Sequence, residues 1–440
     1  MPAAWRLQLP HQRPDNFVHR YLAKLLQRSA RQLGPGLITG AADDDPSGIA
    51  TYSQAGAQFG FNMLWTVVFT YPLMVGIQIV SARIGRVTGQ GLTANISAQY
   101  PRWLLYSIVA LLVAANTINI AADIAAMGEA LQLVVGGGEH GHAIVFGVLS
   151  LLLQVFMPYH RYVRILRWLT LSLLAYVAVL LTVNVPWGEV LKHVVFPRLS
   201  FSAEFVTVVV AVFGTTISPY LFFWQASQEV EEMRADPRGM ALLQSPQVAR
   251  RHLLRIKIDT YIGMGFSNLI AFFIILTTAV TLHSAGITEI ETSAQAAEAL
   301  RPLAGDLTFF MFSMGIIGTG MLAVPVLAGS AAYAMADCFG WNQGLDRKLY
   351  EAKEFYAIIA LATLGGLALD FTPVDPIKAL FWSAVINGVI AVPIMVMLML
   401  MAARPEVMGP FVISRRLKIL GWLATLIMLL AVLAMFVTRR

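Results

Sequence analysis

Three consecutive carboxylates followed by two helix breakers form the most distinctive segment of this chain. The segment Asp43–Gly48 reads Asp-Asp-Asp-Pro-Ser-Gly and lies inside an apolar stretch that covers about residues 34–60. Carboxylates are unfavourable in hydrocarbon, and Pro46 together with Gly48 interrupts the backbone hydrogen bonds of a helix, which frees carbonyl oxygens beside Asp45. Such oxygens are ligands of hard cations. The segment therefore predicts a membrane helix cut in two around a cation site, with Asp45 as principal ligand. The two preceding aspartates could equally cap a helix end or face a water-filled vestibule.

A second interruption of the same kind occurs at Gly214–Tyr220, which reads Gly-Thr-Thr-Ile-Ser-Pro-Tyr within another apolar stretch. Thr215 and Thr216 offer hydroxyl groups and, if the helix unwinds there, carbonyl groups, while Ser218 offers a further hydroxyl. The alternative is a simple kink at Pro219, with the hydroxyls bonded back to the preceding turn. Two interrupted helices in corresponding halves of a chain predict the binding site of a membrane transporter.

Polar residues also recur inside other apolar segments. Asn116, Asn119 and Asp123 follow one another at i, i+3 and i+7, which places them on one face of a helix. We expect this face to line an aqueous pathway, although Asp123 could instead pair with a neighbouring hydroxyl. Asn387 could supply a neutral oxygen to the site or join hydrogen bonds between helices.

The composition excludes a soluble protein of this size. The chain has 440 residues, 57% of them hydrophobic and 13% charged, and its mean hydropathy is +0.67. These values are typical of a polytopic protein embedded in the lipid bilayer. The net charge of +6 comes from basic residues in loops between apolar segments, which indicates topology and not nucleic-acid binding. A single cysteine, Cys338, excludes an internal disulfide and a multi-thiolate metal site.

Hydropathy predicts eleven membrane spans, at about residues 36–58, 62–82, 103–135, 143–158, 165–185, 203–228, 257–283, 307–336, 354–369, 374–401 and 417–437. With the N-terminus in the cytoplasm, 25 of the 31 Lys and Arg residues fall on the cytoplasmic side. We therefore expect a multi-pass protein of the cell membrane, the inner membrane if the source is bacterial. Its basic segment 1–32 would be cytoplasmic and would contain no cleavable signal.

The interrupted spans are the first and the sixth, so the first ten spans divide into five plus five with opposite orientation. This arrangement predicts an inverted repeat, with a first half at about residues 33–185 and a second at about 203–401. Residues 402–440 would add an eleventh span at the periphery. The longest cytoplasmic connection, at about 229–257, is expected to be a solvated loop because acidic and basic residues mix in it.

At its two interruptions the sequence resembles the natural resistance-associated macrophage protein (NRAMP) family of metal transporters. The family motif Asp-Pro-Gly-Asn corresponds to Asp45–Gly48, which reads Asp-Pro-Ser-Gly here. The family motif that ends Ala-Thr-Val-Met-Pro-His corresponds to Thr215–Tyr220, which reads Thr-Thr-Ile-Ser-Pro-Tyr here. The resemblance implies an all-α membrane protein with a LeuT-like fold, a 5+5 inverted repeat and an eleventh transmembrane helix.

Several positions depart from the family pattern. The asparagine ligand of the first motif becomes Gly48, the methionine of the second becomes Ser218, and the histidine linked to proton movement becomes Tyr220. The acid of the family's third helix is shortened to Asp123. These departures resemble the NRAMP-related magnesium transporter branch, in which a roomier site without sulfur takes a more hydrated cation. Mg²⁺ prefers carboxylates, carbonyls and retained waters, and gains nothing from sulfur.

We therefore expect a monomeric secondary transporter, without an enzymatic activity or a cofactor, that imports Mg²⁺ and also Mn²⁺ with weak or no proton coupling. The alternative within the family is a proton-coupled Mn²⁺ or Fe²⁺ importer in which Asp123 accepts the proton. An amino-acid carrier would suffer repulsion from the three aspartates, and an intramembrane enzyme would lack a nucleophile motif. The residues expected at the metal site are Asp45, Gly48, Thr215, Ser218, Asp123 and Asn387.

Overall fold

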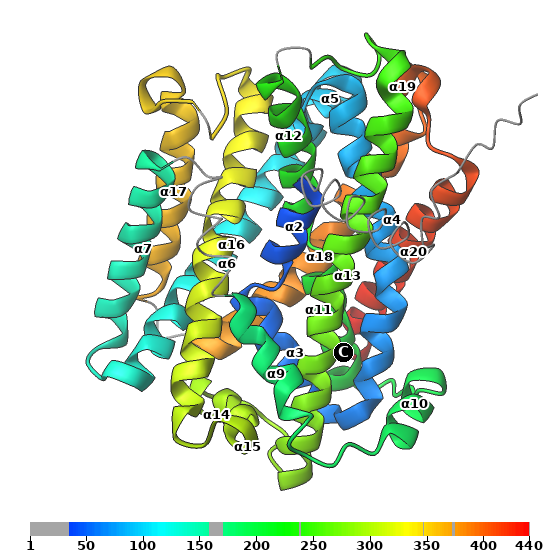
Figure 1. The fold of residues 1–440 in the computed structure, drawn as a ribbon. Helices are drawn as coiled ribbons and strands as arrows, with labels where there is room; N and C mark the ends of the chain where they lie inside the picture. The colour runs from blue at the N-terminus through cyan, green and yellow to red at the C-terminus, as the bar shows by residue number, and fades with distance from the viewer. Residues whose placement is uncertain (1–34, 158–169, 237–238, 346, 372–374, 440) are drawn as a thin grey trace, which may run out of the picture.

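The computed structural model describes residues 35–157, 170–236, 239–345, 347–371 and 375–439, and every regular element in these ranges is helical (Figure 1). The long helices run roughly parallel to one another and form one bundle. The predicted segment 1–32 lies outside the described residues, so its placement stays a prediction.

The helices that build the bundle are much as the hydropathy pattern indicates. They are α2 (Pro35–Asp43), α3 (Pro46–Phe59), α4 (Leu64–Thr88), α6 (Arg102–Val135), α7 (Glu139–Phe156), α9 (Leu174–Val179), α11 (Ala203–Thr216), α12 (Pro219–Ala235), α13 (Ala249–Thr281), α16 (Thr308–Phe339), α17 (Lys353–Leu369), α18 (Pro376–Ala402) and α20 (Arg415–Thr438). Short helices cap the two ends of the bundle, with α5 (Leu92–Gln99) and α19 (Pro405–Met408) at one end and α10 (Trp187–Val195), α14 (Ser293–Ala297) and α15 (Arg301–Ala304) at the other (Figure 1).

Both predicted helix interruptions are present. The first apolar stretch divides into α2 and α3, and the other divides into α11 and α12. Each second half begins with a proline, Pro46 in α3 and Pro219 in α12. Proline suits the first turn because it lacks the amide hydrogen that would have no partner there.

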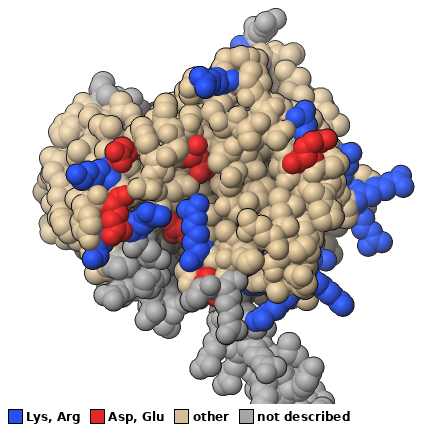
Figure 2. All heavy atoms as spheres, turned by 90° about the horizontal axis from the view of Figure 1, so that it is seen from above, with Lys and Arg blue, Asp and Glu red and all other residues tan. Residues whose placement is uncertain are grey.

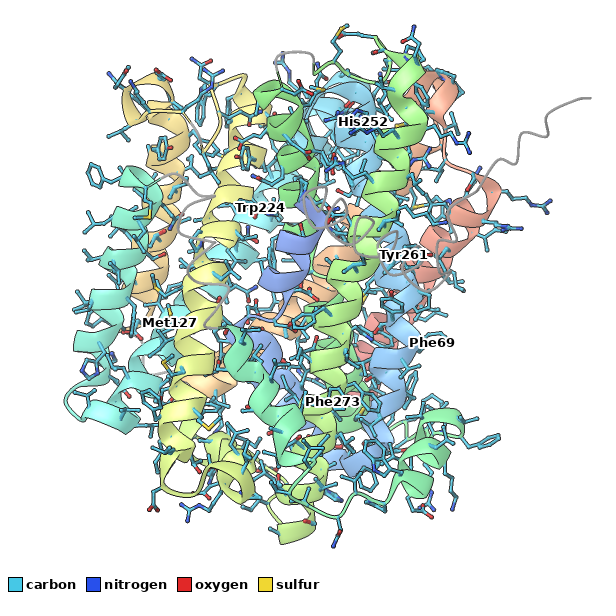
Figure 3. All side chains as sticks on the ribbon, in the orientation of Figure 1. Phe69, Met127, Trp224, His252, Tyr261 and Phe273 are labelled. Atoms are coloured by element: carbon cyan, nitrogen blue, oxygen red, sulfur yellow. The ribbon has the colours of Figure 1, made fainter. Side chains whose placement is uncertain are left out.

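Eight helical segments of the described part of the chain are long and apolar enough to cross a membrane. The difference from the eleven predicted spans has simple causes. The second half of the interrupted first span is continuous with the second span in the segment Pro46–Thr88. The fifth span runs partly through residues 158–169, outside the described part, and α17 has only 17 residues. Figure 3 shows the sorting of side chains that a bilayer requires, with Trp224 and Met127 fully buried and Phe69 and Tyr261 more than 40% exposed on the outside of the bundle.

Glycines allow the interrupted helices to approach their neighbours backbone to backbone. A β-carbon at Gly40 in α2 would lie 2.3 Å from the carbonyl of Gly263 in α13. A β-carbon at Gly214 in α11 would lie 2.1 Å from the carbonyl oxygen of Ala384 and 2.5 Å from the amide of Gly388, both in α18. Close approach of this kind through small residues is the usual packing of membrane helices. It fixes α2 on α13 and α11 on α18 immediately beside the two interruptions.

The prediction of a solvated loop from residue 229 is wrong. Helix α12 continues to Ala235, and α13 begins at Ala249. Glu229 is 0% exposed and accepts a hydrogen bond from the guanidinium of Arg255, which also bonds Glu232 at 2.6 Å. The charged residues that made the segment look like a loop instead pair with one another across two helices.

Candidate cation site between two interrupted helices

Asp45 lies at the first interruption, as the N-cap of α3, and is 2% exposed. Its Oδ1 accepts a hydrogen bond from the amide of Gly48 at 2.7 Å. Its Oδ2 accepts one from the hydroxyl of Tyr220 at 3.3 Å. Each carboxylate oxygen can accept more than one interaction, so Asp45 is held in one orientation and keeps lone pairs for a cation.

Gly48 brings the two interruptions together. The position that its β-carbon would occupy lies 3.2 Å from Oγ1 of Thr215, 3.5 Å from the carbonyl oxygen of Asp43 and 3.4 Å from the ring of Tyr52. The glycine thus lies where α2, α3 and α11 approach one another closely, two of them with oxygens. The sequence prediction that residues around Asp45 and Thr215 converge is consistent with this geometry.

The second interruption shows both features that the sequence left open. Ile217 and Ser218 separate α11 from α12, so the helix is truly broken. At the same time the Ser218 hydroxyl donates to the carbonyls of Gly214 at 3.0 Å and Thr215 at 2.7 Å, and Thr216 bonds back to Val212. No hydrogen bond joins Ser218 to Asp45 among the described residues. Ser218 and the Thr215 carbonyl therefore offer an ion only those lone pairs that these bonds leave free.

Asp123 in α6 approaches the same region. It is 0% exposed and interacts electrostatically with Asp45. Neither of its carboxylate oxygens forms a hydrogen bond of normal geometry within the described part of the chain, and the same is true of both polar atoms of Asn119. Asn116 behaves differently, because it donates to the carbonyl of Leu327 and to Ser330 in α16 and so joins two helices. Of the polar face predicted on α6, Asn119 and Asp123 remain without partners and Asn116 does not.

Helix α18 reaches the site through hydroxyl groups that the sequence did not single out. Ser47 donates to the carbonyl of Leu380 at 3.1 Å, and Ser383 donates to Ser47 at 3.2 Å. Asn387 lies one turn beyond Ser383 on the same helix face, is 1% exposed, and has a side-chain oxygen without a partner among the described residues. Its contribution to the site stays a prediction.

Three further residues beside Asp45 were missed or underrated. Ser267 in α13 donates to Oδ2 of Asp43 at 2.6 Å and to Oδ1 of Asp44 at 3.1 Å. Tyr52 has a fully buried hydroxyl that lies near Thr215 without forming a hydrogen bond of normal length. Tyr220 donates to the carbonyl of Ala42 at 3.1 Å as well as to Asp45. A serine or tyrosine in an apolar helix is too common to be recognised from one sequence.

The donor set is one of mixed oxygens. No group of three or more His, Cys, Asp or Glu side chains within the described ranges is arranged to hold a metal ion. An ion beside Asp45 would therefore complete its coordination with carbonyl and hydroxyl oxygens and with water. Ions that retain part of their hydration shell suit such a site.

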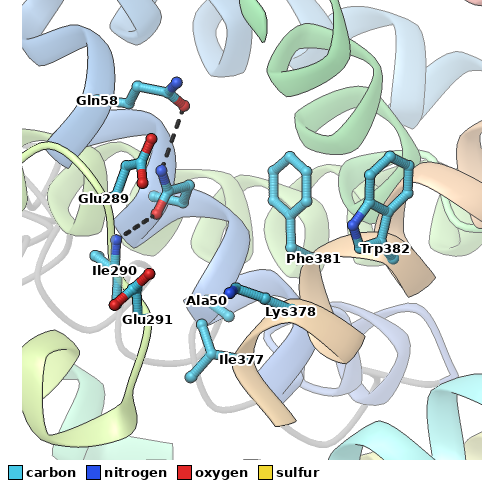
Figure 4. A pocket seen from close by; sticks show the side chains of 10 residues that line it. Ala50, Gln58, Glu289, Ile290, Glu291, Ile377, Lys378, Phe381 and Trp382 are labelled. Atoms are coloured by element: carbon cyan, nitrogen blue, oxygen red, sulfur yellow. Dashed lines mark hydrogen bonds between the residues drawn. The ribbon is translucent and has the colours of Figure 1, made fainter. Parts of the chain in front are cut away.

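A cavity of about 190 Å³ lies at the α14 end of this region, over α3 and α18 (Figure 4). Ala50, one turn beyond Pro46, forms part of its wall. Gln54 fastens the loop above it, because it accepts from the amide of Ile290 at 2.9 Å and donates to Gln58 at 3.3 Å. Glu289, Glu291 and Lys378 place charges at its rim.

An all-helical membrane bundle with two interrupted helices that meet in its interior defines a secondary transporter of the LeuT-like fold. Solved structures agree with this class. The manganese transporter of Eremococcus coleocola superposes with a TM-score of 0.71 at 16% identity, covering 93% of this chain and 88% of that one. The nucleobase-cation-symport-1 family transporter Mhp1 superposes with a TM-score of 0.54 at 13% identity, covering 92% of each chain.

Residues 36–438 match the family described as natural resistance-associated macrophage protein-like. The chain belongs to this NRAMP family, which consists of transporters and not of enzymes. The divalent metal cation transporter MntH of Caldanaerobacter subterraneus is 25% identical over 96% of each chain. The protein of the same name from Acidiphilium cryptum is 28% identical over 86% of this chain and 83% of its own.

Proposed function

We propose that the protein imports divalent metal cations through the site beside Asp45, with Mg²⁺ as the preferred ion and Mn²⁺ as a second substrate. The single observation that carries the proposal is the close approach of Asp45, Gly48 and Thr215 to one another between the two interruptions, with oxygens on both sides. The names of the relatives support transport of divalent metals in general. The Eremococcus coleocola structure is named for manganese, whereas the name shared by the MntH relatives specifies only a divalent metal cation.

The preference for Mg²⁺ rests on the donor atoms. Position 218 carries a hydroxyl where the family pattern has a thioether, and Gly48 has no side chain to occupy the space beside Thr215. Mg²⁺ releases its water slowly and requires oxygen ligands, so a site with few protein donors and space for water suits it. Mn²⁺ shares much of this ligand preference.

The residues would divide the work as follows. Asp45 binds the ion directly, Thr215 contributes its carbonyl oxygen, and Ser218 contributes a hydroxyl or a water-bridged contact. Asp123 offsets the charge of the ion from α6, Gly48 leaves space for water, and Asn387 supplies a neutral oxygen from α18.

Uptake would follow the membrane potential with weak or no proton coupling. Tyr220 occupies the position of the family histidine, and its hydroxyl already donates to Asp45. The membrane potential contributes about 2.3 kcal/mol per charge per 100 mV, and twice that for a divalent ion. We propose that the protein works as a monomer with the α5 and α19 end in the cytoplasm. Figure 2 shows that end, where Lys and Arg side chains surround the face and acidic side chains are fewer.

A proton-coupled Mn²⁺ or Fe²⁺ importer is the second candidate. The observation that favours it is the carboxylate of Asp123, which is buried beside Asp45 and whose two oxygens lack hydrogen-bond partners among the described residues. Such a group can take up and release a proton within a transport cycle. Proton movement during uptake distinguishes the two candidates.

The test is uptake into proteoliposomes of Mg²⁺, Mn²⁺ and Ca²⁺, with internal pH recorded. Asp45→Ala and Asp45→Asn should each lower divalent uptake by at least tenfold, while Asp306→Asn, an exposed carboxylate outside the site, should leave it unchanged. Mg²⁺ uptake without acidification supports the proposal. Acidification coupled to Mn²⁺ entry, with no Mg²⁺ uptake, would establish the second candidate. Full uptake by Asp45→Asn would refute both.

A further inference from the structure

Four carboxylates lie together in the interior without a basic partner. Asp43, Asp44, Asp45 and Asp123 are each at most 2% exposed, and none takes part in the ion pairs of the described residues. A charge in such surroundings must be offset by another charge or by strong hydrogen bonds. The divalent ion of the proposed function offsets two of the four. The remaining two carboxylates must be neutralised by protons or by a further cation.

The geometry around the first two aspartates differs from that around Asp45. Ser267 is the shared hydrogen-bond donor of Asp43 and Asp44, at 2.6 and 3.1 Å, so the two carboxylates share a single hydrogen. Oδ1 of Asp43 has no partner at all within the described part of the chain. Within the described part of the chain the pair is therefore short of hydrogen-bond donors.

Two observations outside the carboxylates point to a cation at this place. Asp43 is the last residue of α2, where the helix carbonyls leave a partial negative charge that attracts cations. Tyr52 in α3 lies close enough to the three aspartates to interact with their charges. Its side chain is 0% exposed, and its hydroxyl forms no hydrogen bond of normal length among the described residues. Its oxygen is one more neutral atom near the carboxylates that could coordinate a cation.

We propose a second cation site formed by Asp43, Asp44 and Ser267, which holds a monovalent metal cation such as Na⁺ while the divalent ion occupies the neighbouring position at Asp45. The donors are all oxygens, which suits a hard ion. A singly charged ion is repelled half as strongly as a doubly charged one by the neighbouring divalent ion, and the one carboxylate charge that it leaves is neutralised by a proton. This proposal extends the proposed function. It rests on that function for the divalent ion at Asp45.

The test measures Na⁺ binding directly, so that it does not depend on transport. Purified full-length protein is titrated with ²²Na⁺ in equilibrium dialysis without divalent ions, at constant ionic strength kept with choline. Wild type should bind Na⁺ saturably, and Asp43→Asn combined with Asp44→Asn should raise the Kd at least tenfold. Asp45→Ala should bind Na⁺ within threefold of wild type although it no longer transports Mg²⁺. Asp306→Asn serves as the control for loss of one carboxylate.

Ser267→Ala is the milder variant in case the double substitution prevents folding, and it should raise the Kd for Na⁺ by about threefold to tenfold. Absence of saturable Na⁺ binding in wild type would overturn the proposal. Two Mg²⁺ bound per chain would also overturn it, since the second site would then be divalent. Loss of Na⁺ binding in Asp45→Ala but not in the double variant would assign the ion to the first site. Failure of Mg²⁺ uptake in wild type, with Na⁺ binding intact, would count against the proposed function alone.

Discussion

The hydroxyl of Tyr220, at the start of α12, donates to Oδ2 of Asp45, at the start of α3, over 3.3 Å. Two residues that lie far apart in the sequence, one beside each helix interruption, are thereby in direct contact. The same hydroxyl also reaches the carbonyl of Ala42 in α2 at 3.1 Å. This one group therefore connects α12 with both α2 and α3, which are three of the four half-helices.

Tyr220→Phe removes this connection without changing the ring. We expect the maximal rate of metal uptake to fall by about tenfold, equivalent to about 1.4 kcal/mol, because a hydrogen bond to a charged acceptor contributes about 1.5–3 kcal/mol. The measurement is initial uptake at saturating metal. Tyr71→Phe, at a hydroxyl that donates to Tyr261 far from the site, is the matched control. An unchanged rate in Tyr220→Phe would show that the contact is incidental.

Ser218→Met restores the thioether of the family pattern. We expect the preference for Mn²⁺ or Cd²⁺ over Mg²⁺ to rise at least tenfold, because sulfur binds softer metals and gives Mg²⁺ nothing. Competition of each metal against Mg²⁺ uptake measures it. Ser218→Leu adds similar bulk without sulfur, and a similar shift in that variant would assign the effect to size alone.

Gly40→Ala tests the contact between α2 and α13. The added methyl group would lie 2.3 Å from the Gly263 carbonyl, so the helices must separate. We expect about 1–3 kcal/mol of destabilisation, visible as a lower Tm in detergent. Gly141→Ala, inside α7 with nothing within 4 Å of the added group, should leave the Tm unchanged or raise it slightly. Equal Tm values for the two variants would contradict the packing described.

Arg255→Met leaves Glu229 buried without its main partner. We expect about 3–5 kcal/mol of destabilisation, because an unpaired charge in the interior is strongly unfavourable. Glu232→Gln removes the more exposed half of the same arrangement and should change stability by at most about 1 kcal/mol. The free energy of unfolding of the two variants, measured side by side in detergent, provides the check. A larger loss in Glu232→Gln would reverse the roles assigned to the two glutamates.

Much of the architecture could be predicted because it depends on local chemistry. Proline and glycine beside Asp45 and at residues 214–219 predict the two helix interruptions, and both interruptions are present. The membrane class follows from hydropathy, and the LeuT-like fold is implied by the resemblance of the two interruptions to the NRAMP motifs; both are confirmed. The predicted end of the sixth span near residue 229 was wrong. A run of charged residues is interpreted as a loop unless its partners on another helix are known.

The site itself could be predicted only in part. The proximity of Gly48 to Thr215 agrees with the expected convergence, but the metal ligands remain predictions. The Ser267 bridge between Asp43 and Asp44 depends on contacts between distant segments and left no signal in the sequence. The division of labour between Asn116, which joins two helices, and Asn119, which does not, depends on the rotation of α6 and could not be derived from spacing.

The close backbone contact between α11 and α18 at Gly214 also limits how the molecule can move. The backbone of Gly214 touches that of Ala384 and Gly388, so no side chain separates the two helices at this level, although Val206 and Val210 of α11 pack against α18 elsewhere. A motion that parts them would expose bare peptide groups to hydrocarbon, which is strongly disfavoured. We therefore expect these two helices to move together as one rigid unit when the pathway opens. The rearrangement would then occur at their contacts with other helices.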